Sequence, residues 1–211
     1  MVEALRLFKR GRVSVTGKIA PHDGGVVFFG GGHAVPQVAE PDLVLTAAEA
    51  ESFRRFWPLF RAARQIPAVE AAIRRFSYAG ERTRPDDEIV DLVAALEGLL
   101  LSGISEAGEF AYRTSLRGAL FIGGTGLTRR QVRKQLGRGY AVRSAVAHGA
   151  EPRKSDLKSP NGESADLAEF VDGIDDLVRS ALHQAVEAVG GGATWPPDWE
   201  ALTLEGGSYS P

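Results

Sequence analysis

One arginine and one histidine in the second half of the chain have the spacing and chemistry to act together on a phosphate. Arg143 and His148 stand as R-x4-H in residues 128–149, TRRQVRKQLGRGYAVRSAVAHG. An imidazole titrates near neutral pH, and a guanidinium can bind two phosphate oxygens at once. The pair therefore indicates acid–base chemistry at a phosphate, and the sequence suggests no cofactor for it.

The segment that carries this pair is predicted to be one helix. Thr128 with Gln131 matches a capping box, and Gly149 is a suitable residue to end the helix. The apolar residues at roughly helical spacing are Val132, Leu136, Tyr140 and Val146. These residues predict a helix with one side packed against a core.

Arg143 and His148 should not share a face of that helix. Positions five apart are rotated by about 140° on a helix of about 3.6 residues per turn. The two side chains could meet at one phosphate if the helix ends near Ala147, or if two copies of it meet in a dimer. The alternative is an ordinary structural or surface arginine and a histidine that caps the helix C-terminus, where positive charge is favoured.

Residues 110–150 form a basic segment with no Asp or Glu. Its eight basic residues are Arg113, Arg117, Arg129, Arg130, Arg133, Lys134, Arg138 and Arg143. A stretch of one charge sign attracts polyanions. We therefore predict that RNA or a nucleotide binds this segment, with Arg129, Arg130, Arg133, Lys134 and Arg138 as the binding residues.

Two other interpretations fit the same segment. Acidic residues of a predicted helix at 164–189 could balance its charge: Asp166, Glu169, Asp172, Asp175 and Asp176. Residues 127–139, LTRRQVRKQLGRG, are also compatible with a helix-turn-helix that binds DNA. The apolar stripe continues through Tyr140 and Val146, which predicts a buried helix and argues against a helix that enters a DNA groove.

Glu97 and Arg117 are predicted on the apolar faces of two further helices, at residues 85–101 and 109–122. A buried carboxylate requires a partner, so we predict that Glu97 pairs with Arg117 or with Arg143. The alternative is that both side chains extend to the edge of the core.

Length and composition indicate one helical domain with additions at both ends. The chain has 211 residues, 44% of them hydrophobic, a formal net charge of -2 and no cysteine. We predict a mainly α fold: a small β-rich appendage at 1–45, a helical domain at 46–190 and a C-terminal tail at 191–211. With no cysteine, no signal-like start and no apolar run long enough to span a bilayer, we expect a cytoplasmic protein without a membrane partner.

Individual elements follow from local patterns. Strands are predicted at residues 5–8, 13–19 and 26–29, with a flexible glycine turn at 30–33. Helices are predicted from 46, with a kink or break at Pro58, and at 67–79, 85–101, 109–122 and 164–189. Residues 195–199 should fold back as an apolar latch, and the last six should be disordered. The histidines, His22, His33, His148 and His183, are scattered, so no metal site is predicted.

Three segments together carry a resemblance to a known family. Residues 89–101, IVDLVAALEGLLL, then Arg117, then residues 140–149, YAVRSAVAHG, resemble the HEPN superfamily of helical domains, and specifically its ApeA-like branch. The resemblance covers about residues 47–190. It implies a HEPN-like helical bundle that dimerises with the two R-x4-H motifs facing each other.

The resemblance also implies a function, that of a metal-independent endoribonuclease in a defence or toxin role. His148 would act as base on a ribose 2′-hydroxyl or as acid toward the leaving 5′-oxygen, Arg143 would stabilise the phosphorane, and Glu97 and Arg117 would support them. Active members often have Asn, Asp or His after the motif arginine, where this chain has Ser144, a supporting residue whose hydroxyl can still hydrogen-bond a phosphate. Other members are non-catalytic nucleotide- or RNA-binding dimers, which is the alternative function.

Overall fold

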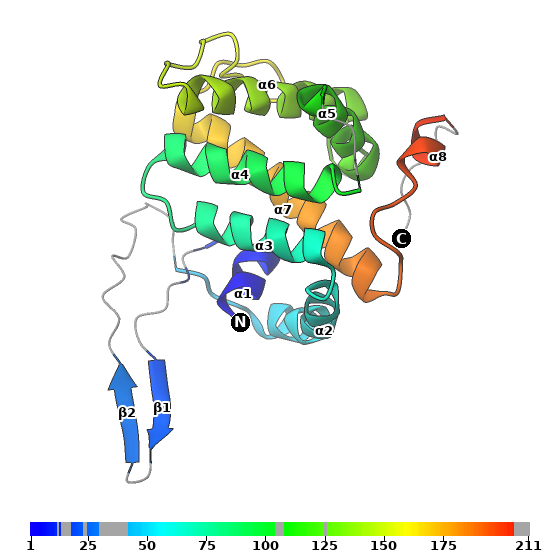
Figure 1. Ribbon diagram of the computed structural model, residues 1–211. Coiled ribbons are helices and arrows are strands. Elements are labelled where there is room, and N and C mark those ends of the chain that lie inside the picture. The colour runs from blue at the N-terminus through cyan, green and yellow to red at the C-terminus, as the bar shows by residue number, and fades with distance from the viewer. Residues whose placement is uncertain are drawn as a thin grey trace.

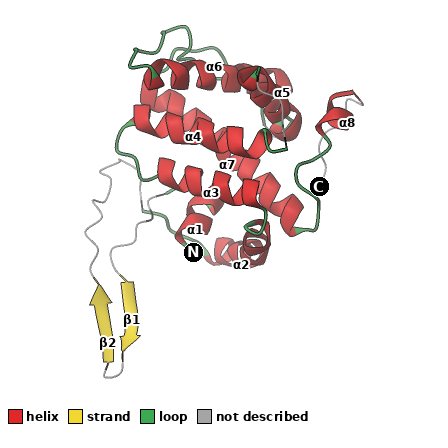
Figure 2. Ribbon diagram, in the orientation of Figure 1, coloured by secondary structure: helices red, strands yellow, loops and turns green. Residues whose placement is uncertain are grey.

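Helices make up most of the part of the chain that the structure describes (Figures 1 and 2). The computed structural model describes residues 1–11, 13, 18–22, 25–29, 42–103, 108–124 and 126–204. Its helices are α1 Val2–Phe8, α2 Ala47–Ala63, α3 Pro67–Ala79, α4 Pro85–Leu100, α5 Phe110–Ile122, α6 Arg129–Ala147, α7 Leu167–Gly190 and α8 Trp199–Leu204. The predicted mainly α class is confirmed.

The longest helix, α7, lies behind α3 and α4 in Figure 1 and packs against both of them and against α2. Its buried apolar side chains include Phe170, Val171, Ile174, Leu177, Val178 and Leu182. Leu167 packs at the edge of the same core. A capping box of Asp166 and Glu169 begins the helix. Because its apolar stripe is wide, α7 can pack against several neighbouring helices at once.

The N-terminus departs from the prediction. Residues 5–8 were expected to form a strand, but they belong to α1, whose Ala4 and Leu7 are fully buried. The Phe8 ring packs edge-on against Phe53 of α2, with 5.3 Å between the ring centroids. Apolar residues at positions 4, 7 and 8 have helical spacing, and α1 packs against α2, α3 and α7. The first part of the predicted appendage therefore joins the helical core.

A β-hairpin follows α1. Strand β1, Lys18–His22, pairs antiparallel with β2, Gly25–Phe29, with Lys18 opposite Phe29. The strand predicted at 26–29 is confirmed, and the one predicted at 13–19 agrees only at its last two residues. The rest of that strand, apart from residue 13, and the glycine turn at 30–33 lie outside the described residues.

Pro58 does not break α2, which runs from Ala47 to Ala63. A proline inside a helix removes one backbone hydrogen bond and crowds the preceding turn. The buried rings of Phe56 and Phe60 anchor the helix on either side of Pro58, so packing offsets that cost. A capping box of Thr46 and Glu49 begins α2, at the residue predicted for its start.

Helix α6 is positioned by close packing against α5 and by caps at both ends. A Cβ atom on Gly118 of α5 would lie 2.3 Å from the Leu136 Cδ1 atom of α6, so the two helices approach closely there. The predicted capping box of Thr128 and Gln131 is present. The helix ends with His148 as its C-cap, followed by Gly149 with a φ of +71°. A positive φ is easy only for glycine, which explains the stop.

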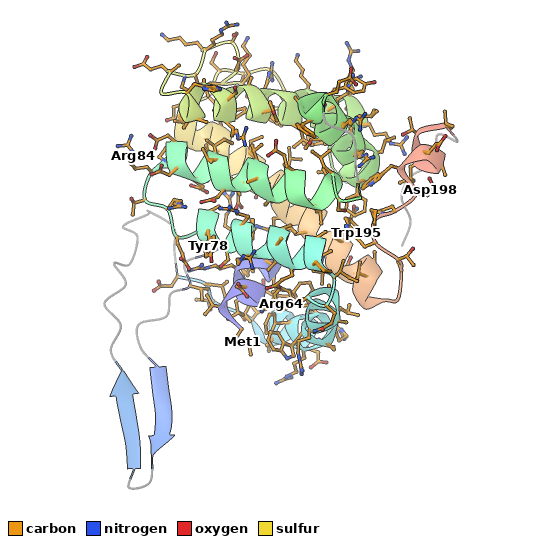
Figure 3. The ribbon with its side chains drawn as sticks, viewed as in Figure 1. Met1, Arg64, Tyr78, Arg84, Trp195 and Asp198 are labelled. Carbon is orange, nitrogen blue, oxygen red and sulfur yellow. The ribbon has the colours of Figure 1, made fainter. Side chains whose placement is uncertain are left out.

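The C-terminal segment forms the predicted latch. The rings of Trp195 and Trp199 pack edge-on against Phe121 of α5, at centroid distances of 5.5 and 6.0 Å. Figure 3 shows the labelled Trp195 and Asp198 along this returning segment. The predicted disorder of the last six residues lies outside the described part of the chain.

Two helical glycines provide a matched test of this packing. A Cβ on Gly190 of α7 would lie 2.6 Å from the Leu59 Cα atom, whereas a Cβ on Gly98 of α4 would meet no neighbouring segment of the described chain within 4 Å. Gly190→Ala should destabilise the fold by about 1–3 kcal/mol, because backbone must move to admit the methyl group. Gly98→Ala should stabilise it by about 0.5–1 kcal/mol. Urea unfolding measures both changes, and equal effects would contradict the described contact of α2 with α7.

Candidate functional site

Arg143 lies on the side of α6 that faces α4 and pairs with Glu97. Its Nη2 atom is 3.5 Å from the Glu97 Oε2 atom, and the side chains are 29% and 21% exposed. The guanidinium also lies 5.7 Å from the centre of the Tyr140 ring. Its Nε atom is buried and has no hydrogen-bond partner among the described residues. Of the two partners predicted for Glu97, the structure therefore has Arg143, and this arginine is only partly engaged.

The surroundings of Glu97 disfavour its charge. Burial raises the pKa of the Glu97 carboxyl above its ordinary value, and the opposing effect of Arg143 is smaller. The prediction of a buried carboxylate at this position is only half right, because the side chain stays partly exposed. The salt bridge therefore holds Arg143 in place at some cost in desolvation.

The deeply buried carboxylate of α4 is Asp91, which the sequence analysis missed. It is 3% exposed and receives hydrogen bonds from Arg75 at 3.1 Å and Arg82 at 2.7 Å. Asp91 lies four and eight positions before Ala95 and Leu99, both buried, so helical spacing was the available signal. This cluster joins α3 to α4 and lies outside the candidate site.

His148 is exposed at the C-terminal end of α6. Its backbone N–H donates to the carbonyl oxygens of Ser144 and Ala145, both at 3.2 Å, and its ring has no hydrogen bond or ion pair with any described residue. As predicted from the spacing, Arg143 and His148 point to different sides of the helix. One copy of the chain does not bring the two groups into contact.

The exposed face of α6 carries His148 at one end and cations at the other. Eighteen residues make five helical turns, so Arg130 and His148 lie on the same face, about 27 Å apart. Arg130, Arg133 and Lys134 are exposed and form no ion pair with any described residue. These three cations and His148 define what we call the α6 outer face.

The other two predicted RNA-binding residues have structural contacts. Arg138 donates hydrogen bonds to the carbonyl oxygens of Lys158 and Ser159, at 3.4 and 3.3 Å. Arg129 is partly buried next to Gly123. Arg138 therefore fixes the loop after α6, and the exposed cations are fewer than predicted.

The acidic residues of α7 do not neutralise the basic segment. Asp175 pairs with Arg10 at 3.2 Å and with Arg179 at 2.7 Å, and Asp172 and Asp176 also pair with Arg10. The remaining two, at 166 and 169, form the capping box of α7. The idea that these acidic residues balance the basic segment is wrong, because their partners are Arg10, which precedes the hairpin, and Arg179 of α7.

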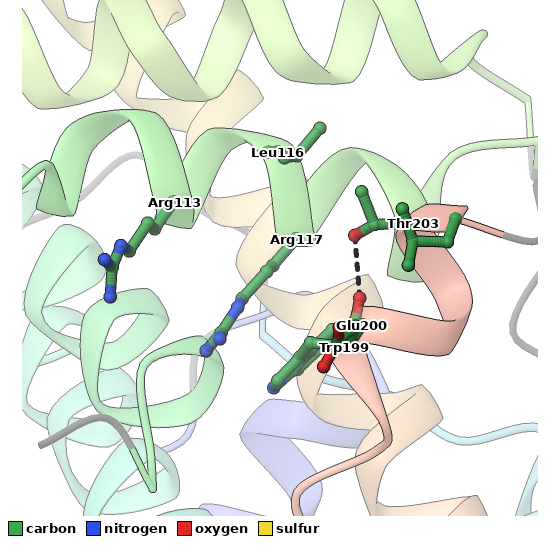
Figure 4. A pocket seen from close by; sticks show the side chains of 7 residues that line it. Arg113, Leu116, Arg117, Trp199, Glu200 and Thr203 are labelled. Atoms are coloured by element: carbon green, nitrogen blue, oxygen red, sulfur yellow. Dashed lines mark hydrogen bonds between the residues drawn. The ribbon is translucent and has the colours of Figure 1, made fainter.

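Arg117 lies apart from Glu97. Its Nη1 atom donates to the Leu100 carbonyl oxygen at 2.7 Å, and its guanidinium lies 5.1 Å from the centre of the Trp199 ring. Burial, and then the like charge of Arg113, lower the pKa of Arg117. Arg113 and Arg117 line a cavity of about 310 Å³ between α5 and α8 (Figure 4). Arg117 therefore joins the end of α4 to the latch, away from Arg143.

Comparison of the chain with protein-family models, with characterised proteins and with solved structures finds no match. Among the described residues, none of the helices is long and apolar enough to cross a membrane. Within the same residues, no group of three or more His, Asp or Glu side chains is placed to hold a metal ion.

Replacing Glu97 by glutamine tests whether burial or the attraction of Arg143 has the larger effect on the Glu97 carboxyl. At pH 7 the Glu97→Gln variant should melt within about 3 °C of the wild type, since the pair is partly exposed. A carboxyl whose pKa is raised by folding stabilises the fold at low pH and loses that contribution as pH rises through the folded pKa. The stability of the wild type relative to that of the variant should therefore increase when pH is lowered from about 7 to about 4.

Paired thermal melts across this range measure the difference. The exposed Glu51, which pairs with Arg54 of the same helix, provides the control variant Glu51→Gln. If the melting temperature of the wild type instead fell relative to that of Glu97→Gln on acidification, attraction to Arg143 would outweigh burial at Glu97. The pKa of Glu97 would then be lowered by folding, not raised.

Proposed function

We propose that this protein is a HEPN-type, metal-independent endoribonuclease that binds RNA on the α6 outer face and cleaves it at His148 and Arg143. One observation carries the proposal most directly. The exposed imidazole of His148 lies on the same helix face as three exposed cations that have no carboxylate partner among the described residues. Backbone phosphates are attracted to such a face, and the imidazole is free to exchange protons with a bound strand.

The chemistry follows from the residues. The imidazole of His148 takes the proton of a ribose 2′-hydroxyl, and the 2′-oxygen attacks the adjacent phosphorus. The bond to the 5′-oxygen then breaks, and that oxygen takes a proton from a general acid. The products are a 2′,3′-cyclic phosphate end and a 5′-hydroxyl end. Arg143 stabilises the charge that develops on the phosphorane, because a guanidinium can donate two hydrogen bonds to its oxygens.

A homodimer supplies what one copy lacks. Among the histidines whose burial the structure describes, one chain offers one exposed imidazole, that of His148, and Arg143 points about 140° away from it around the helix axis. If the C-terminal ends of two α6 helices face each other, the second copy contributes a second His148 as the acid. Each Arg143 then reaches across from its place beside Glu97. The resemblance of residues 89–101 and 140–149 to ApeA-like HEPN domains supports this arrangement.

A second candidate function is non-catalytic binding of RNA or a nucleotide by the same dimer. The observation in its favour is the salt bridge between Arg143 and Glu97, at 3.5 Å, which holds the guanidinium on the side of α6 away from His148. In that case the cations of the outer face hold RNA, and Arg143 has a structural role. A DNA-binding helix-turn-helix is disfavoured because Val132, Leu136 and Val142 of α6 are buried.

Cleavage of RNA in the presence of EDTA tests the proposal. Wild-type protein should cut single-stranded RNA to products with 2′,3′-cyclic phosphate ends. His148→Gln should lower the rate by about 100-fold or more, the usual contribution of a general acid or base. Arg143→Lys keeps the charge but not the two-pronged geometry and should also slow cleavage.

His183→Gln is the matched control, because His183 stacks on Phe56 at 4.8 Å, on another helix. Its rate should equal that of the wild type. Binding of RNA without any cleavage, or cleavage that His148→Gln leaves unchanged, would contradict the nuclease proposal. The first of these results would establish the second candidate.

A further inference from the structure

An exposed aromatic ring lies beside the α6 outer face. Tyr112, in the first turn of α5, is 50% exposed, and the nearby Phe110 is 40% exposed. By contrast, the rings of Phe56, Phe60 and Phe121 are buried in the core. Exposed apolar side chains are not unusual one at a time, but two on one helical turn, one of them in contact with a cation, need an explanation.

Arg133 covers the Tyr112 ring. Its guanidinium carbon lies 5.2 Å from the ring centre, and Arg133 itself is exposed and has no ion pair with any described residue. The cation and the ring thus come from two helices, α6 and α5, and meet at the surface. Planar bases stack on aromatic rings and on arginine planes, and the arginine adds attraction for phosphate.

The face between this pair and His148 is open. At Gly137, between them, a Cβ would meet no atom of the described residues within 4 Å outside the neighbouring helix backbone, and Ala141 is exposed. Arg130 lies one turn before Lys134, which is next to Arg133 in the chain. A strand could therefore run along α6 from the cations to the imidazole without meeting a large side chain.

We propose that Tyr112 and Arg133 form a stacking site for an unpaired base, so that the ligand of the outer face is single-stranded RNA. This inference rests on the proposed function and specifies its substrate. In an RNA duplex the base faces are stacked inside and cannot reach the ring, whereas an unpaired base can lie flat on it. An acidic peptide would satisfy the cations but would gain nothing from an exposed tyrosine ring.

The length of α6 also sets how many nucleotides of an RNA strand can contact the outer face. About 27 Å separates the cationic end from His148. At about 3.4 Å for each stacked nucleotide, this corresponds to about eight nucleotides. Oligomers of 12 nucleotides should therefore bind more tightly than oligomers of four.

Fluorescence anisotropy with a labelled 12-nucleotide oligouridine and a 12-base-pair RNA duplex tests the proposal. All proteins carry His148→Gln, so that the probe stays intact. Tyr112→Leu should weaken binding of the single strand by about ten-fold, and Tyr112→Phe should preserve it, because stacking needs the ring and not the hydroxyl. Binding of the duplex should be the same for all three proteins.

Tyr78→Leu is the matched control for loss of an exposed ring. Tyr78 is 43% exposed and lies on α3, which α4 separates from α6 (Figure 3). This variant should bind the single strand as the parent protein does. Lys134→Gln should weaken binding of both the single strand and the duplex, because it removes a phosphate contact from either.

The outcomes separate the two proposals. If Lys134→Gln weakens binding and Tyr112→Leu does not, the stacking site is wrong and RNA binding stands. If no RNA binds at low salt, both fail. If polyglutamate displaces the RNA and Tyr112→Leu weakens binding of polyglutamate equally, the surface recognises an acidic protein, and the stacking proposal is overturned.

Discussion

The burial of one side of α6 decides which of its side chains meet the solvent. Leu136 packs against Gly118 of α5, and Val132 and Val142 are buried in the core. With the helix fixed in rotation, Arg143 faces α4, whereas Arg130 and His148 face outward. The surface that α6 offers depends on that rotation, because turning the helix by about 140° would bring Arg143 outward and His148 inward.

Packing also decides which charged side chains form ion pairs. Carboxylates of α7 are paired with Arg10 and Arg179, and Asp91 is paired with two arginines across α3 and α4. Within the described residues, the cations of the α6 outer face have no such partner. A chain with a net charge of -2 therefore has a local surface of the opposite sign, and a local surface of this kind attracts a polyanion even when the whole protein does not.

Much of the helical core could be predicted, because its signals are local. The capping boxes at Thr46 and Thr128 and the periodic apolar residues of α7 mark their helices without any tertiary information. The misses depend on packing between distant segments. Helix α1 is short and is stabilised by burial of Leu7, and Pro58 is tolerated because its neighbours are buried. Arg10, which pairs with Asp175 of α7, lies more than 160 positions before it in the chain. For the site, helical spacing correctly separated Arg143 from His148, but only the fold could select Arg143 over Arg117 as the partner of Glu97.

The central claim is that RNA lies on the α6 outer face within reach of His148. Nuclear magnetic resonance of protein labelled with ¹⁵N at its four histidines tests it directly, with a 2′-O-methylated single-stranded RNA that lacks the attacking hydroxyl. The account predicts that the ring signals of His148 shift on addition of this RNA while those of His183 stay in place. Unchanged His148 signals at a concentration of RNA that saturates binding would contradict it.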